Sequence, residues 1–219
     1  MWGDFPQRLC QQTGCSGLVY DRLGYGQSDA DVSQRSVHYL HEAALGELPQ
    51  VIRHYIGERD YVVIGHSDGG SIALMHAAAQ PRGLRGVVTA AAHVFVEDMT
   101  LAGIRRAQAA YAKGKLNKLR AFHEDKTDAL FCAWADIWLS APFRHWNIEY
   151  LLAAISCPLL VTQGVDDQYG SRKQVDAIVS QSQGPAAALM LEDCAHAPHH
   201  EQGEQLTEHV VRFLVDIAE

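Results

Sequence analysis

A serine, an aspartate and a histidine, far apart in a chain of 219 residues, each come a few residues after a short apolar run. They are Ser67, Asp167 and His196. A serine hydroxyl is a poor nucleophile at neutral pH, and it becomes effective when an imidazole takes its proton and a carboxylate orients that imidazole. The residue types and their order therefore favour a hydrolytic centre built on a serine nucleophile.

The glycines around Ser67 indicate a sharp turn from a strand into a helix. The segment Gly65-His66-Ser67-Asp68-Gly69-Gly70 follows the apolar run Tyr61-Val62-Val63-Ile64 and precedes an alanine-rich helical pattern. Glycines two residues either side of the serine leave room where the two backbones pass too close for a Cβ. The start of the helix offers N–H groups to a developing oxyanion. A glycine-rich turn with an incidental serine is the alternative interpretation.

Two adjacent acids compete for the role of orienting the imidazole. Both lie in the loop after the apolar run Pro158–Gln163. Asp167 lies three residues beyond Gly164, which is the usual offset for such an acid, and it is therefore preferred. Asp166 is predicted to be a loop residue that satisfies nearby backbone N–H groups.

Three histidines compete for the role of base. His196 comes first after its strand and before Pro198, and it is preferred. His199 and His200 are predicted to be surface residues in the first turn of a helix. These histidines with Glu201 could suggest a metal site, but their spacing across a proline does not place ligands on one helical face. No metal is therefore predicted.

The elements that must position these residues alternate between strand and helix. Such alternation predicts a mostly parallel sheet with helices on both faces, which is the α/β class. Helices are expected near residues 37–56, 71–79, 172–182 and 201–218, and Pro49 should kink or split the first of them. The expected strands are Leu18–Tyr20, Tyr61–Ile64, Gly86–Ala91, Pro158–Gln163 and Ala186–Leu191.

The alternation breaks over residues 96–150, which are predicted to form a helical cap on a core made of residues 1–95 and 151–219. Trp134 and Trp138, four residues apart, share one helix face. That face packs in the cap or on the sheet in the favoured interpretation, and lines the substrate pocket in the other. Candidate pocket residues are Asp68, His93, Phe95, Trp134 and Trp138.

Composition argues against several classes of function. The formal charge of −8 disfavours a polyanionic partner, and no Lys/Arg-rich run suggests nucleic acid. No apolar stretch approaches the roughly 20 residues of a membrane span, and no signal-peptide pattern is present. Five cysteines, an odd number without regular spacing, indicate a reducing compartment, so a cytoplasmic location is predicted. No cofactor is predicted, the expected partner is a small-molecule substrate, and the oligomeric state stays open.

The sequence resembles the α/β-hydrolase superfamily over nearly all of its length. Besides the serine turn and the two loops, Asp21–Ser28 matches the family pattern Asp-x-x-Gly-x-Gly-x-Ser. The resemblance implies that Ser67 is the nucleophile, Asp167 the acid and His196 the base. It also implies that the backbone N–H of Asp68 is one donor of the oxyanion hole.

One departure from the family pattern affects the expected activity. In the family, three strands and a His-Gly loop precede the segment with which this sequence begins, Met1-Trp2-Gly3-Asp4-Phe5, and that loop supplies the second oxyanion donor. The sequence has no counterpart of these strands or of the loop. We therefore expect an N-terminally shortened form, in which loss of one donor costs about 100- to 1,000-fold in turnover.

The resemblance implies hydrolysis of a small carboxylic ester or related acyl compound through an acyl-enzyme on Ser67. Carbon–carbon bond hydrolysis is one alternative, but it needs a cationic site for a carboxylate that the sequence does not assign. A non-catalytic or impaired ligand-binding member is the other. The Asp68 carboxylate either interacts with the positive end of the helix dipole at the start of its helix or recognises a cationic group of the substrate.

Overall fold

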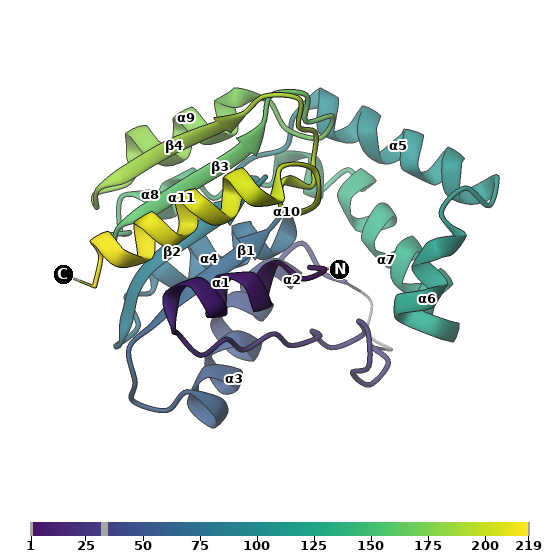
Figure 1. Ribbon diagram of the computed structural model, residues 1–219. Coiled ribbons are helices and arrows are strands. Elements are labelled where there is room, and N and C mark those ends of the chain that lie inside the picture. The colour runs from purple at the N-terminus through teal and green to yellow at the C-terminus, as the bar shows by residue number, and fades with distance from the viewer. Residues whose placement is uncertain (1, 32–34, 219) are drawn as a thin grey trace.

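Four parallel strands form the sheet, and their carboxyl ends meet at one end of it (Figure 1). The computed structural model describes residues 2–31 and 35–218, and within them the strand order is β1-β2-β3-β4. All four strands coincide with apolar runs expected from the sequence, because such runs can be buried on both faces of a sheet. Their bounds are Tyr61–His66 for β1, Leu84–Ala90 for β2, Leu159–Gly164 for β3 and Ala186–Leu191 for β4.

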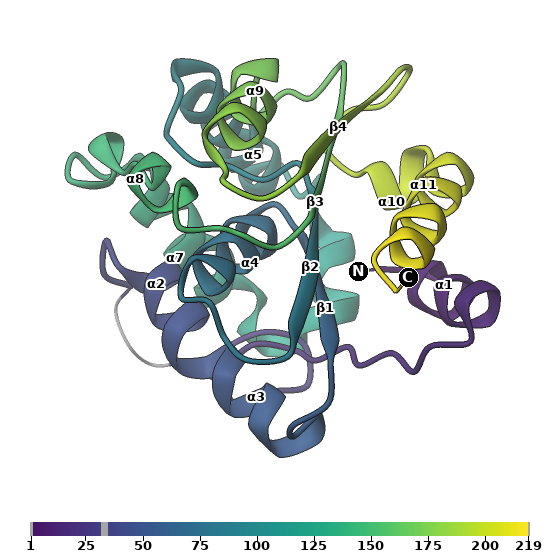
Figure 2. The same ribbon diagram turned by 90° about the vertical axis from the view of Figure 1, so that its left-hand side faces the viewer.

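Helices cover both faces of the sheet (Figure 2). On one face, α1 (Phe5–Thr13) packs along α11 (Gly203–Asp216), and their apolar side chains meet Val88 and Leu160 of the sheet. The larger core lies on the other face. This three-layer arrangement confirms the predicted α/β class. The helices of the second face include α3 (Leu48–Tyr55), α4 (Asp68–Ala78) and α9 (Arg172–Gln181).

Two of the predicted helical regions are each divided. The region near residues 37–56 consists of α2 (Tyr39–Glu42), a π-helical segment Ala43–Glu47 and α3. Pro49 lies in the first turn of α3, directly after the π-helical segment, where its missing N–H interrupts the hydrogen-bond ladder while the helical backbone continues. The C-terminal region consists of α10 (Pro198–Glu201) and α11, which meet at Gln202.

The prediction of a strand at Leu18–Tyr20 is wrong. Residues 14–22 have irregular backbone, and Leu18 and Val19 are 44% and 55% exposed. A strand needs a neighbour for its N–H and C=O groups. Within the described chain β1 is an end strand of the sheet, and no strand lies between it and this segment. The glycine turn that follows does form, with positive φ at Gly24 and Gly26.

Helices and short turns make up residues 98–152, of which the helices over residues 98–139 lie to one side of the sheet and the last one packs against α4 and α9 (Figure 1). At their base an isolated antiparallel bridge joins Phe95 to Asn147. This segment matches the expected helical insertion, and its identification as a cap with bounds 96–150 stays a prediction. Its α-helices are α5 (Asp98–Ala112), α6 (Arg120–His123), α7 (Thr127–Leu139) and α8 (Glu149–Leu152).

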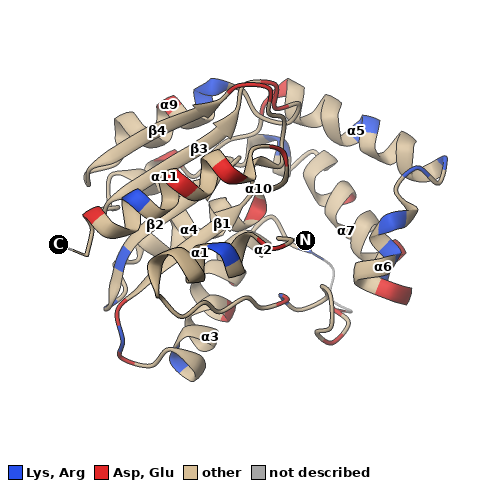
Figure 3. Cartoon of the chain, viewed as in Figure 1, with Lys and Arg blue, Asp and Glu red and all other residues tan. Residues whose placement is uncertain are grey.

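Charged residues of both signs are interspersed over the helices (Figure 3). Within the inserted segment, for example, Arg120 pairs with Asp128 at 2.7 Å. In the part of the chain that the structure describes, no helix combines the length and the apolar character needed to cross a bilayer.

The five cysteines are all free thiols. Cys194, close to the candidate base, is buried, and burial is the main cause that raises its pKa to about 11. A thiol with such a pKa stays protonated at neutral pH, so Cys194 is a small core residue rather than a second nucleophile.

Candidate active site

Ser67, His196 and Asp167 lie within hydrogen-bonding distance of one another at the carboxyl ends of the strands. His196 Nε2 is 3.0 Å from Ser67 Oγ, and His196 Nδ1 is 2.9 and 3.0 Å from the two carboxylate oxygens of Asp167. A carboxylate accepts the Nδ1–H, which leaves Nε2 with a free lone pair facing the hydroxyl. The arrangement can take the proton of Ser67 and hold it.

The backbone at Ser67 is strained in the way a sharp strand-to-helix turn requires. Ser67 has φ 53° and ψ −122°, which L-residues rarely adopt. A Cβ on Gly65 would lie 2.1 Å from the carbonyl oxygen of Gly69, and a Cβ on Gly70 would lie 2.7 Å from the Cβ of Ala92. Glycine is therefore required at both positions, and the turn presents the hydroxyl above the sheet.

Asp167 is held as a carboxylate acceptor by three donors. Besides His196, the backbone N–H of Tyr169 donates to Oδ1 at 2.8 Å, and Gln163 Nε2 donates to Oδ2 at 3.3 Å. Burial opposes ionisation of this carboxyl, but the hydrogen bond and charge of His196 and the Tyr169 amide outweigh it, so the pKa of Asp167 is lowered. Asp166 is exposed, and its N–H donates to the carbonyl of Cys194. The geometry thus separates the two competing acids.

Asp68 begins α4 directly after the serine, and it is 8% exposed. Its Oδ2 accepts the hydroxyl of Tyr39 at 2.8 Å and lies 3.8 Å from a guanidinium nitrogen of Arg22. Burial raises the pKa of Tyr39, so the phenol remains a donor. The Asp68 carboxylate therefore already has a cationic neighbour, and a substrate amine would compete with Arg22.

The other candidate pocket residues are placed at different depths. His93 is buried, with Nε2 3.1 Å from the carbonyl oxygen of Tyr169 and its ring 6.1 Å from that of His196. Trp138 packs edge-on to His93 and donates its Nε1–H to Tyr39 at 2.8 Å.

Phe95 and Trp134 are partly buried against the main core. Trp134 also packs 5.7 Å from the ring of Phe131 within α7. Both tryptophans therefore make packing contacts, and the choice between a packing face and a substrate-pocket face stays a prediction.

His199 is not the surface residue expected from the sequence. It is 3% exposed, and its ring lies 4.7 Å from those of both Trp2 and His66. The N-terminal segment before α1 packs over this turn, which no local pattern indicates. Among residues 2–31 and 35–218, no group of three or more His, Cys, Asp and Glu side chains is placed to hold a metal ion.

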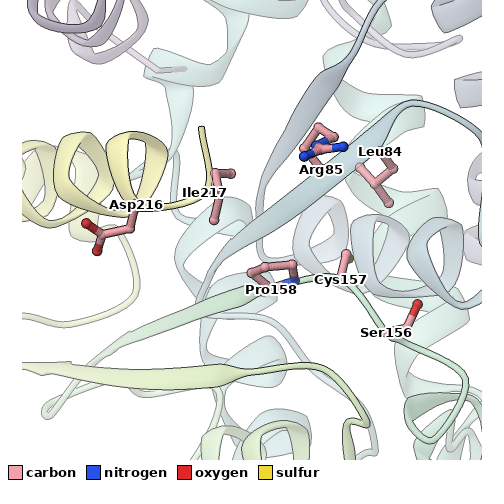
Figure 4. Close-up of a pocket in the computed structure, with 7 residues that line it drawn as sticks. All are labelled: Leu84, Arg85, Ser156, Cys157, Pro158, Asp216 and Ile217. Atoms are coloured by element: carbon pink, nitrogen blue, oxygen red, sulfur yellow. The ribbon is translucent and has the colours of Figure 1, made fainter. Parts of the chain in front are cut away.

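A surface hollow of about 350 Å³ lies at the opposite end of the sheet (Figure 4). It sits where β2 and β3 begin, whereas Ser67, Asp167 and His196 lie where strands end. The hollow is therefore separate from the candidate active site. Its lining residues are Leu84, Arg85, Ser156, Cys157, Pro158, Asp216 and Ile217.

Sequence reasoning did not assign three residues that contact the site. His66 Nε2 lies 2.6 Å from the carbonyl oxygen of His196, and Tyr39 and Arg22 both approach Asp68. His66 adjoins the serine, and Arg22 lies in the family-like glycine segment, so both had a positional signal. Tyr39 had none, because its contact with Asp68 depends on how α2 packs against α4.

Comparison with known proteins gives a match over most of the chain. The profile described as "Alpha/beta hydrolase family" matches residues 1–209. Among curated proteins, a proline iminopeptidase of Saccharolobus solfataricus is 35% identical over 75 residues, which are 34% of this chain and 24% of that protein. The match thus spans about a quarter of that relative.

Solved structures give the same fold. NosK from Streptomyces actuosus superposes with a TM-score of 0.76 at 19% identity, covering 99% of this chain and 93% of NosK. A thermophilic esterase from Thermogutta terrifontis superposes with a TM-score of 0.71 at 18% identity, covering 98% and 85%. At these identities the likeness is one of fold.

Proposed function

Because the chain belongs to the alpha/beta hydrolase family, we propose that it is a serine hydrolase that cleaves a small carboxylic ester through an acyl-enzyme on Ser67. The single observation that carries the proposal is the short chain of contacts from Ser67 Oγ through His196 to Asp167. A buried carboxylate beside an imidazole that faces a strained serine is the arrangement that serine activation requires.

Catalysis proceeds in two halves. His196 Nε2 takes the proton of Ser67 as the oxygen attacks the ester carbonyl, and Asp167 stabilises the imidazolium that forms. The N–H of Asp68, in the first turn of α4, has no acceptor within its helix and donates to the oxyanion. The imidazolium then protonates the leaving alcohol. Water, deprotonated by His196, attacks the acyl-enzyme, and the imidazolium returns its proton to Ser67 Oγ as the acid leaves.

The alternatives receive less support. Carbon–carbon bond hydrolysis needs a cation for a substrate carboxylate, and Arg22, which lies beside the serine turn, is already paired with Asp68. A member that only binds ligand does not need an imidazole held between a serine and a buried acid. An amide substrate is the nearest variant, since the curated relative is named an iminopeptidase. Five unpaired thiols support a reducing compartment, and we propose the cytoplasm.

Labelling with a fluorophosphonate tests the proposal, because such a probe phosphonylates an activated serine. We expect the wild-type protein to be labelled, Ser67→Ala to lose the label, and Ser180→Ala to keep it. Ser180 is exposed, with its hydroxyl bonded to the Asp176 carbonyl, so it is a matched control. Absence of labelling on folded wild-type protein would reject the proposed activity.

A further inference from the structure

The segment that carries His196 is held by a side chain outside it. The backbone N–H of Ala195 donates to Oε2 of Glu201, and the N–H of Ala197 donates to Oε1, each at 2.8 Å. A single carboxylate therefore spans the two residues on either side of His196. Hydrogen bonds from backbone N–H groups to a carboxylate are among the stronger ones in proteins.

A second side chain holds the carbonyl of His196 itself. His66 Nε2 lies 2.6 Å from that oxygen, and the two imidazole rings are 5.0 Å apart. A carbonyl can only accept, so Nε2 of His66 carries the proton and donates it. His66 is also the residue before Ser67 in β1. One residue of the serine turn is thus bonded directly to the backbone of the base.

These contacts fix backbone on both sides of the imidazole. Backbone rotation in the loop between β4 and α10 would change the 3.0 Å distance between His196 Nε2 and Ser67 Oγ. Displacements of about 1 Å in a catalytic group can cost about 100-fold in rate. We propose that Glu201 and His66 are positioning residues, which clamp the backbone around His196 so that its imidazole stays between Ser67 and Asp167. This inference rests on the proposed function.

The charge state of His66 suits this task. Burial, followed by repulsion from His196, lowers its pKa to about 4, against the opposing effects of its bond to the His196 carbonyl and of the Asp167 and Asp68 charges. His66 is therefore neutral near pH 7. A neutral neighbour adds no second positive charge beside the imidazolium that forms during the reaction.

Substitution of Glu201 tests one half of the clamp. Glu201→Gln keeps the size but places an amide NH₂ against one of the two N–H groups. We expect kcat to fall about 10- to 100-fold with KM within about twofold, because the change displaces the base rather than the binding surface. Glu204→Gln, in the first turn of α11, makes the same charge change on an exposed residue and should leave kcat unaltered.

Substitution of His66 tests the other half. His66→Phe keeps a ring but removes the donor, whereas His66→Gln keeps an N–H that can reach the carbonyl. We expect a fall in kcat for the first and recovery of most of it in the second. A general loss of folding would lower the thermal midpoint of both variants, whether or not the new side chain can donate a hydrogen bond.

A spectroscopic readout separates this inference from the activity itself. The proton on His196 Nδ1, bonded to Asp167, should give a low-field ¹H NMR signal in the wild type that broadens or disappears in Glu201→Gln and His66→Phe. An unchanged signal and kcat within twofold of wild type in both variants would overturn the clamp. The wild-type protein could fail to react with the fluorophosphonate and still show the low-field signal, with that signal lost in the two variants. This result would reject the proposed activity and leave the clamp supported.

Discussion

Replacing Asp167 with asparagine should nearly abolish turnover while leaving the fold in place. Both carboxylate oxygens lie close to His196 Nδ1, at 2.9 and 3.0 Å, so either orientation of the amide puts an NH₂ group against the Nδ1–H. The NH₂ group favours the imidazole tautomer whose proton is on Nε2, the nitrogen that must accept the proton of Ser67. The neutral amide also no longer stabilises the imidazolium.

The size of this effect follows from two losses acting together. A wrong tautomer and a missing counter-charge cost about 10³- to 10⁴-fold in kcat, or about 4 to 5.5 kcal/mol at about 1.36 kcal/mol per tenfold. The assay is hydrolysis of p-nitrophenyl acetate at pH 7.5, with the thermal midpoint measured alongside.

Asp166→Asn provides the matched control, because it makes the same chemical change one residue away on an exposed side chain. It should keep kcat within about twofold of the wild type. The reasoning is refuted if Asp167→Asn retains more than a tenth of the wild-type rate, or if the two variants lose activity equally.

Three further changes probe the structure around the site. Gly65→Ala puts a Cβ 2.1 Å from the carbonyl oxygen of Gly69 and should lower the free energy of unfolding by about 3 kcal/mol in urea titrations. Gly46→Ala, where a Cβ meets open space, should not lower it, and equal midpoints for the two variants would contradict the turn geometry. His66 has a pKa of about 4 in the folded protein and about 6.5 in the unfolded chain, so the folded state binds fewer protons. Its contribution to the free energy of unfolding, up to about 3 kcal/mol, is therefore complete above pH 6.5 and is lost as the pH falls towards 4. His66→Gln should flatten that pH dependence of the unfolding free energy, and an unchanged slope would rule the contribution out. Trp138→Phe removes the donor to the Tyr39 hydroxyl and also deletes one of the two fused rings of a buried indole, so it should cost about 2 to 4 kcal/mol in the same titrations. No loss would mean that neither the hydrogen bond nor the packing of the indole contributes.

The sequence was sufficient for the sheet and for the place of the site because both follow from local patterns. Four apolar runs became parallel strands, and the carboxyl ends of such strands meet at one end of a sheet. Ser67, Asp167 and His196 each follow a strand, so the sequence alone predicts their convergence. Their catalytic roles stay predictions until they are measured.

Other features depend on contacts that no local pattern encodes. Leu18–Tyr20 has the composition of a strand, but pairing needs a neighbour, and the described chain gives it none. His199 lies in a helical first turn as expected, yet Trp2, far away in sequence, buries it. The bond between Glu201 and the amides beside His196 arises from the fold of one loop and leaves no periodic signal.

Trapping the acyl-enzyme tests the central proposal most directly. Wild-type protein mixed with p-nitrophenyl acetate, quenched in acid within milliseconds and digested, should carry an acetyl group on the peptide that contains Ser67. His196→Ala should form that adduct far more slowly. An acetyl group on any other residue, or turnover of the ester without a covalent adduct, would contradict the mechanism.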